Sequence, residues 1–341
     1  MPSEALSRAI RQLAHGGSLD AELARLAFDS IMLGEASPAQ VAALLVGLRV
    51  KGETVEEMAG AAGAMRGSML RVAASDPDAL VDTCGTGGGN VTTFNISSAA
   101  ALLAAGMGVR IAKHGNRSFT SRSGSADVLE ALGVVIELQP AQMERVLREA
   151  GIVFMYAPVM HPAMRHVGPV RRDLAIPTLM NIVGPLANPA GAGRQVVGVA
   201  DRARMPLIAG ALAMLGSVHA LVVHGEPGMD EISPLGTTSV LEVRSGSIGE
   251  WSIEPQSLGI GEIAAEDLAG GDPAENAAII EELLSGGGAR GARAAVALNA
   301  AGAVYVSGGG AFAEAYERAV DGLRQGAGLV ALERLRAASR E

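Results

Sequence analysis

The sequence predicts an α/β protein with a small all-helical N-terminal domain and a large α/β domain built on a mostly parallel central sheet. In the first 70 residues, apolar positions such as Leu23, Leu26, Ala27 and Ile31 recur at the spacing of helices with one buried face. Beyond Asp76-Pro77-Asp78 the period changes, and short apolar strands alternate with helices. Such alternation indicates βαβ units and therefore parallel strands.

The helical domain is expected over residues 1–72, and its helices have clear starting signals. A first helix capped by Ser3 should end at Gly16-Gly17, and a second is expected over 20–33. Two capping boxes, at 37–40 and 54–57, predict helices that end near Gly52 and Met69.

The α/β domain is expected over residues 78–341, after the linker. Its predicted strands are 79–83, 109–112, 152–155, 195–199 and 218–223, and its predicted helices are 96–107, 124–132, 140–150 and 203–215. Residues 158–190 break this rhythm, and about 168–190 is expected to join the helical domain in space. After residue 236 the sheet should become antiparallel or edge-like, as in 238–243, and the chain from Pro273 should be helical.

Composition excludes several classes of protein. The formal charge of −9 argues against a nucleic-acid surface, which normally carries a basic patch. A single cysteine, Cys84, excludes a disulfide framework and a cysteine-rich zinc site. The longest charge-free runs are interrupted by Gly, Ser, Asn or Pro, and no signal peptide is evident, so we expect a cytoplasmic protein without a membrane partner.

The first candidate site follows the first predicted strand, where Gly85-Thr86-Gly87-Gly88-Gly89 leads into a polar stretch that ends at Ser98. Consecutive glycines let backbone N–H groups approach a phosphate, and the next helix adds a positive dipole end. A glycine turn alone is weak evidence, but Asn95, Ser97 and Ser98 at the helix start strengthen the prediction of an anion site.

The second candidate site follows the next strand, over Lys113 to Asp127. Lys113 is one of only two lysines among 27 basic residues, and a lysine amine suits a phosphate oxygen. Its alternative role is that of an exposed loop lysine. Gly124-Ser125-Ala126-Asp127 starts a helix, where it would hold an anion or simply cap the helix.

Two further segments carry groups suited to chemistry. The stretch from His161 to Asp173 holds two histidines and three arginines, and Arg171 offers a bidentate fork for a carboxylate, although a solvated helix face is the common alternative. Asp230 and Glu231 follow a buried strand and suit a magnesium ion that also binds substrate phosphates; a solvated turn is the alternative.

Taken in order, these motifs resemble the anthranilate phosphoribosyltransferase family over nearly the whole chain. The runs that carry the resemblance are Gly85-Thr86-Gly87-Gly88, Asn95-Ile96-Ser97, Ala112-Lys113-His114-Gly115-Asn116-Arg117, Gly124-Ser125-Ala126-Asp127, His161-Pro162-Ala163-Met164, Val170-Arg171-Arg172, Gly184-Pro185-Leu186 and Asp230-Glu231-Ile232-Ser233. The resemblance implies a fold like that of nucleoside phosphorylases and phosphoribosyltransferases, and a homodimer through the helical domain. It also implies a Mg²⁺-dependent step of tryptophan biosynthesis, in which anthranilate and 5-phosphoribosyl-1-pyrophosphate (PRPP) give N-(5-phosphoribosyl)anthranilate and pyrophosphate.

The resemblance also implies residue roles. The PRPP-binding residues would be Gly85, Gly88, Gly89, Thr93, Asn95, Ile96, Ser97, Ser98, Lys113, His114, Gly115, Asn116, Arg117, Ser118, Phe119, Thr120, Ser121 and Ser125. The anthranilate-binding residues would be Gly85, Asn116, His161 and Arg171, with Arg171 facing the carboxylate. Ser97, Asp230 and Glu231 would serve the magnesium, and no covalent nucleophile is implied.

Three positions depart from the family pattern. Gly89 stands where the family has an acidic residue, and Ser98 replaces a threonine. After Arg172, the usual Leu-Gly-x-Arg-Thr is replaced by Leu174-Ala175-Ile176-Pro177-Thr178. We therefore expect one contact to the ribose or the metal shell to be lost or to be made by Asn90, and the loop after Arg172 to differ from the family without affecting Arg171.

Two other classes compete with this interpretation. Pyrimidine nucleoside phosphorylases share the two-domain plan and a glycine-rich phosphate loop, but they lack the Lys-His-Gly-Asn-Arg run found here at 113–117. A non-enzymatic relative that binds nucleic acid is disfavoured by the net acidity and by the joint presence of Arg171 and Asp230-Glu231. Salt-dependent binding to single-stranded DNA would distinguish it.

Overall fold

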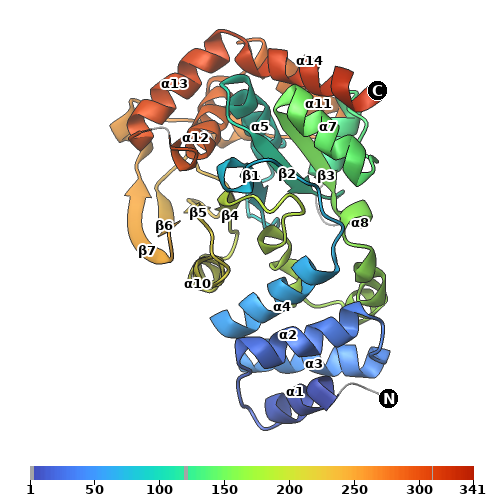
Figure 1. Ribbon diagram of the computed structural model, residues 1–341. Helices are drawn as coiled ribbons and strands as arrows, with labels where there is room; N and C mark the ends of the chain where they lie inside the picture. Colours follow the sequence, from blue (N-terminus) through green and yellow to red (C-terminus); the bar gives the residue numbers. More distant parts are fainter. Residues whose placement is uncertain (1–3, 119–121, 309) are drawn as a thin grey trace.

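The helical domain lies at the base of the molecule (Figure 1). The computed structural model describes residues 4–118, 122–308 and 310–341. The domain consists of α1 (Glu4–Ala14), α2 (Ala21–Met32), α3 (Pro38–Lys51) and α4 (Val55–Ser68). Both predicted capping boxes form: Ser37 and Gln40 exchange hydrogen bonds at the start of α3, and Thr54 and Glu57 do so at the start of α4. The predicted starts of these two helices are confirmed.

The central sheet has seven strands in the order β3-β2-β1-β4-β5-β6-β7. They are β1 (Val81–Gly85), β2 (Ile111–Gly115), β3 (Ile152–Tyr156), β4 (Arg194–Gly198), β5 (His219–Gly225), β6 (Thr238–Arg244) and β7 (Ser247–Ile253). The first five run parallel, and β6 and β7 add an antiparallel edge. The predicted fold class is confirmed. The edge strand β7 was not predicted, because most of its side chains are exposed and carry no clear apolar alternation.

The two faces of the sheet belong to two hydrophobic cores. Successive residues of a strand point to opposite faces, and β4 shows this directly: Val196 joins the upper core, whereas Val197 joins the core that continues into the helical domain. On β5, Leu221 and Val222 divide in the same way. The helical domain is thus packed against the underside of the sheet through a continuous apolar layer.

Helices cover both faces (Figure 1). The upper core contains residues of α5 (Ile96–Gly106), α6 (Ser125–Ala131), α7 (Pro140–Ala150), α11 (Pro273–Leu284), α12 (Arg290–Val306), α13 (Phe312–Arg324) and α14 (Ala327–Arg340). On the other face, α10 (Met205–Met214) packs against β5, β6 and α4, so it links the sheet to the helical domain.

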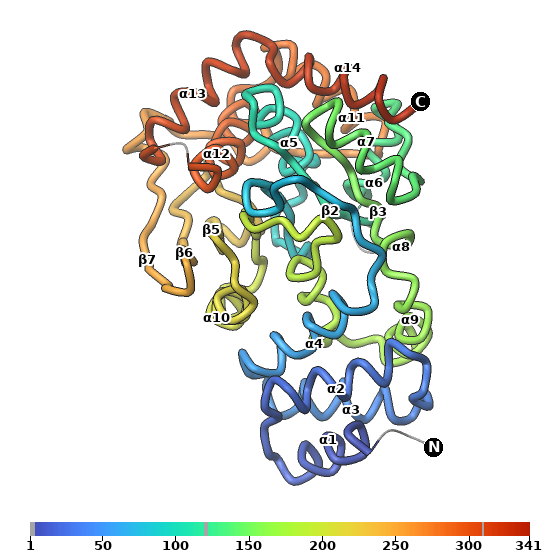
Figure 2. Tube along the Cα trace, viewed as in Figure 1, coloured from blue at the N-terminus to red at the C-terminus, as the bar shows by residue number. Residues whose placement is uncertain are grey.

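The segment between β3 and β4, where the predicted alternation breaks, consists of short helices and loops. It contains α8 (Ala157–Met160), η2 (Pro162–His166), α9 (Gly168–Leu174), η3 (Leu179–Asn181) and η4 (Gly184–Leu186). Figure 2 shows α9 beside the helical domain, where it contacts α3. Arg66 of α4 donates to the carbonyl of Leu186 at 2.7 Å. The domain limits at residues 72 and 78 remain a prediction.

The described residues also form four other single-turn helices: η1 (Pro77–Ala79), η5 (Arg202–Arg204), η6 (Pro255–Leu258) and η7 (Ala265–Leu268). Among the described residues, no helix combines the length and apolar character needed to cross a membrane.

Candidate active site

The glycine loop after β1 is closed by an aspartate from a distant part of the chain. The backbone N–H of Gly87 donates to Oδ2 of Asp230 at 2.8 Å. A Cβ added at Gly85 would lie 2.6 Å from the same oxygen, and at Gly198 it would lie 1.7 Å from the Asp230 carbonyl oxygen. Gly87 and Gly88 have positive φ angles, which favour glycine. The loop therefore needs glycine both for its turn and for the close approach of Asp230.

The start of α5 is closed in the same manner by Glu231. The N–H of Ser97 donates to Oε1 of Glu231 at 3.1 Å. Because the N-terminus of a helix attracts negative charge, this carboxylate occupies the position predicted for an external anion. Ile96 is completely buried, and its N–H donates to the carbonyl of Phe94 at 2.8 Å.

Other residues predicted near this helix have structural contacts. The side chain of Asn95 does not cap α5; its amide donates to the Ser123 carbonyl, and its oxygen accepts from Ser123 and Asn276. The hydroxyl of Ser98 is buried with no hydrogen-bond partner in the described part of the chain. Thr93 is half-buried and its carbonyl lies close to Gly270.

Lys113, on β2, is almost fully buried beneath this helix start. Its amine donates to the Thr83 carbonyl at 2.5 Å and to the Ser97 hydroxyl at 3.3 Å. Burial lowers the pKa of Lys113, while Asp82 and Glu231 oppose this shift. In this arrangement the Lys113 amine is not exposed on the loop; it supports Ser97 from behind.

A polar network that the sequence analysis missed lies beside Lys113. Asp82 on β1 is fully buried, and its carboxylate accepts from the His114 N–H at 3.1 Å and from the Asn188 side chain at 2.7 Å. The same Asn188 amide donates to the Ala112 carbonyl at 2.9 Å. Burial raises the pKa of Asp82 to about 6, against the opposing effect of Lys113. The only signal in the sequence was a charged residue within an apolar strand.

The structure brings His114 and His161 together, with their Nε2 atoms 3.2 Å apart. Burial lowers the pKa of His114 to about 3 and that of His161 to about 4, and the nearby His161 further disfavours charge on His114. Both imidazoles are therefore neutral near pH 7.

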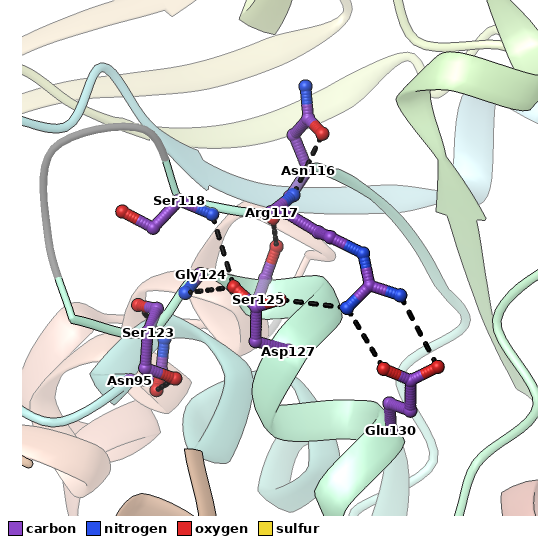
Figure 3. Close-up of polar contacts among 9 residues, drawn as sticks. All are labelled: Asn95, Asn116, Arg117, Ser118, Ser123, Gly124, Ser125, Asp127 and Glu130. Carbon is purple, nitrogen blue, oxygen red and sulfur yellow. Dashed lines mark hydrogen bonds and ion pairs between the residues drawn. The ribbon is translucent and has the colours of Figure 1, made fainter. Parts of the chain in front are cut away.

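The loop after β2 is held by its own residues (Figure 3). Oδ2 of Asp127 accepts from the N–H groups of Ser118 at 3.1 Å and Gly124 at 2.8 Å. Arg117 forms ion pairs with Asp127 and Glu130, which raise its pKa. Asp127 thus caps the start of α6, and the Arg117 guanidinium pairs with two carboxylates of the same helix.

The remaining predicted residues of this loop lie close to one another. The Ser125 hydroxyl donates to the Asn116 carbonyl at 3.3 Å. A Cβ at Gly115 would lie 2.2 Å from that hydroxyl, so glycine is needed there. Phe119, Thr120 and Ser121 lie outside the described residues.

Arg171 is half-buried on α9, and its side chain has no hydrogen-bond or ion-pair partner among the residues that the structure describes. Burial lowers its pKa. At the end of α9, Ala175 adopts a left-handed conformation with φ of 52°. This is the position where the family pattern has glycine, and an alanine there carries backbone strain.

The donor set fits a magnesium ion that is completed by other ligands. Asp230 and Glu231 are both half-buried, and removal from solvent together with the charge of Asp230 raises the pKa of Glu231 to about 8. Lys113 offsets this shift only in part. Within the described residues, no group of three or more His, Cys, Asp or Glu side chains would hold a metal alone. Mg²⁺ commonly binds to one or two carboxylates, with waters and substrate phosphates completing the shell.

Comparison with known proteins defines the class. Residues 77–329 match the model of the glycosyl transferase family, a/b domain, and residues 7–69 match that of its helical bundle domain. The chain is thus a two-domain glycosyl transferase.

Comparison with individual proteins identifies the family within this class. The chain is 50% identical over 336 residues to the anthranilate phosphoribosyltransferase of Rubrobacter xylanophilus, covering 98% of both chains. The solved enzyme of Thermus thermophilus has a TM-score of 0.92 at 41% identity, covering 98% of this chain and 99% of that one. The enzyme of Saccharomyces cerevisiae in complex with PRPP and Mg has a TM-score of 0.89 at 29% identity and 99% coverage of both chains. The chain belongs to the anthranilate phosphoribosyltransferase family.

Proposed function

We propose that this site transfers the phosphoribosyl group of PRPP to the amine of anthranilate in tryptophan biosynthesis, giving N-(5-phosphoribosyl)anthranilate and pyrophosphate. One observation supports it beyond family membership: two acidic residues bond directly to the backbone N–H groups of the loop and helix predicted to bind phosphate. Such an arrangement places a cation site and an anion site side by side, as a metal–pyrophosphate substrate requires.

PRPP would lie along the first crossing. The N–H groups of Gly87 and Ser97 would bind its phosphate oxygens once Asp230 and Glu231 turn toward Mg²⁺, with Ser97 as a further metal ligand. Bound magnesium would neutralise charge on the leaving pyrophosphate. The Gly89 departure fits this geometry: a Cβ there would lie 3.3 Å from Oδ1 of Asp230, so an acidic side chain would crowd a second carboxylate, whereas glycine leaves room.

Anthranilate would lie toward α9 and the second crossing, near Gly85, Asn116 and His161. The Arg171 side chain, which has no hydrogen-bond or ion-pair partner among the described residues, would bind its carboxylate through a bidentate fork. The amine would attack the ribose carbon, the bond to pyrophosphate would break with its electron pair on the leaving oxygen, and the amine would lose a proton. Positioning and electrostatics can supply most of the rate enhancement.

The experiment that tests this function follows anthranilate fluorescence after the purified chain is mixed with PRPP and Mg²⁺. We expect the fluorescence to fall, and EDTA to stop the reaction. Stable fluorescence with folded protein would contradict the proposal. Omission of PRPP is the control for photobleaching and non-specific quenching.

Arg171 provides the sharpest test of the acceptor site. Arg171→Ala should raise KM for anthranilate on the order of tenfold or more, because a charge-assisted pair is lost, and should leave KM for PRPP nearly unchanged. Arg172→Ala, at the exposed neighbouring position, is the matched control. Equal effects of the two substitutions would argue against a carboxylate contact.

We also propose a homodimer through the helical domain and a cytoplasmic location without a nucleic-acid partner. The dimer is supported by large apolar side chains that this domain exposes, including Leu33 at 70% and Val50 at 81%. Sedimentation of the native chain and of a Leu33→Asp, Val50→Asp variant tests it. We expect a dimer that dissociates in the variant, and an unchanged mass would contradict this interface.

A further inference from the structure

A second cavity lies between α12, α13 and the segment 259–261, and it shares no lining residue with the candidate active site. Its volume is about 360 Å³, within the usual range of small-molecule sites. Figure 1 shows α12 and α13 at the end of the molecule opposite the helical domain. The cavity is therefore remote from both the proposed dimer surface and α9.

Three arginines line this cavity in a chain whose net charge is −9. Arg290 donates to the carbonyl of Glu262 at 3.1 Å, which fixes its position. Arg324 pairs with Asp321 in an exposed i,i+3 contact, which is weak in water. Arg293 has no hydrogen-bond or ion-pair partner through its side chain among the described residues. Of the three guanidinium groups, only that of Arg324 forms an ion pair with a carboxylate in the described part of the chain.

The rest of the lining is suited to an apolar body. Ile260, Val320 and the ring of Tyr316 form part of the wall, and burial raises the pKa of Tyr316. Small residues of α12, including Ala294 and Ala297, leave space between the helices. A charged rim above an apolar floor favours ligands that carry an anionic head on a ring.

We propose that this cavity binds an organic phosphate whose ring lies against Tyr316 and Val320 and whose phosphate meets Arg290, Arg293 and Arg324. A phosphate monoester has three terminal oxygens for these guanidinium forks, whereas a carboxylate has only two oxygens. The site is independent of the proposed transferase reaction and requires no metal.

The first experiment titrates the full chain with phenyl phosphate by isothermal calorimetry, in the presence of saturating PRPP and Mg²⁺ and without anthranilate. We expect one binding event that persists under these conditions, with inorganic phosphate and benzoate each binding at least about tenfold more weakly. No binding of phenyl phosphate in the absence of PRPP would overturn the proposal. Binding that PRPP abolishes would also overturn it if Arg293→Ala combined with Arg324→Ala leaves the PRPP-free binding unchanged. Equal affinity for inorganic phosphate would overturn the role of the apolar wall.

Variants test whether phenyl phosphate binds in this cavity. Arg293→Ala combined with Arg324→Ala should weaken phenyl phosphate at least about tenfold, because two charge-assisted contacts are lost. Arg318→Ala removes another exposed arginine of α13 that does not line the cavity, and it is the matched control. Circular dichroism and the anthranilate assay check that all variants are folded. Unchanged affinity in the double variant, or equal loss in the control, would exclude this cavity.

Discussion

The crossings from β1 to α5 and from β2 to α6 both present backbone N–H groups to a carboxylate, but the carboxylates come from different places. In the first crossing, Asp230 and Glu231 bond to Gly87 and Ser97, which lie 143 and 134 residues away in sequence. In the second, Asp127 bonds to Ser118 and Gly124, at separations of nine and three residues.

The difference distinguishes a crossing that would bind a ligand from one whose carboxylate supports its own loop. Asp127 belongs to the helix that it caps, and its pairing with Arg117 adds to that local fixation. Asp230 and Glu231 belong to another loop, and burial raises the pKa of both carboxyl groups. Lys113 offsets the shift of Glu231 only in part, and a magnesium ion would add positive charge in the proposed reaction. In the proposed reaction the first crossing therefore exchanges its partners, whereas the second keeps its loop in place.

The largest effect is expected when the carboxylates of Asp230 and Glu231 are removed from the first crossing. Asp230→Asn with Glu231→Gln should lower turnover by at least about a hundredfold, because the magnesium ligands are lost and their negative charge cannot be replaced by amides. The rate is measured across a magnesium titration. Unchanged turnover across that titration would refute the metal role.

A smaller loss is expected when the approach of Asp230 is obstructed. At Gly85, a Cβ would lie 2.6 Å from Oδ2 of Asp230, so Gly85→Ala should displace that carboxylate and lower kcat/KM about 10- to 100-fold. Gly67→Ala is the matched control, because a Cβ at Gly67 meets nothing within 4 Å. Wild-type kinetics in Gly85→Ala would show that the close contact is not needed.

The stability of the protein should depend on pH through the buried His161. The folded-state pKa of His161 is lowered to about 4 by burial. The contribution of the neutral imidazole to the free energy of unfolding is therefore present above pH 6.5 and is lost as the pH falls toward 4. From this group the free energy of unfolding should decrease by about 2 kcal/mol between pH 7.5 and pH 5. In urea unfolding, the His161→Gln variant should not show that decrease in the free energy of unfolding.

His15→Gln, at an exposed position of the helical domain, is its control. A His161→Gln protein that loses the same stability on acidification as the parent chain would show that the buried imidazole is not responsible.

The smallest effect is expected at Asp127, whose carboxylate caps its own helix. Asp127→Asn should reduce the free energy of unfolding by about 1 kcal/mol and raise KM for PRPP a few-fold, with kcat nearly unchanged. Thermal unfolding and steady-state kinetics measure these changes. Glu130→Gln removes only the exposed half of the Arg117 network and should alter stability by about 0.5 kcal/mol or less. A kcat loss as large as that of the Asp230 variant would remove the distinction between the two crossings.

Local signals predicted the elements well where the cause of the structure is local. The helix predicted over 140–150 occurs as α7 (Pro140–Ala150), because proline at its start and Gly151 after its end mark both limits within the sequence itself. The strand β7 escaped prediction because its place at the edge is determined by pairing with β6. Its exposed side chains carry little pattern of their own.

The candidate site was predictable as a collection of residues but not as a set of contacts. Asp82 was missed because its amide partner, Asn188, lies 106 residues further along the chain. Arg117 was grouped with phosphate ligands because it belongs to a specific motif, yet its guanidinium pairs with carboxylates of the following helix. Such pairings depend on tertiary geometry, which residue type and spacing do not encode.

Gly198 has a consequence for anyone who redesigns this enzyme for other acceptors. A Cβ there would lie 1.7 Å from the carbonyl oxygen of Asp230, in a part of the fold where the obstructing atom belongs to the main chain and cannot rotate away. A mutant library should therefore keep positions 85 and 198 fixed. Diversity is better introduced at Gly184, where an added Cβ meets nothing within 4 Å, and at the exposed positions that follow α9.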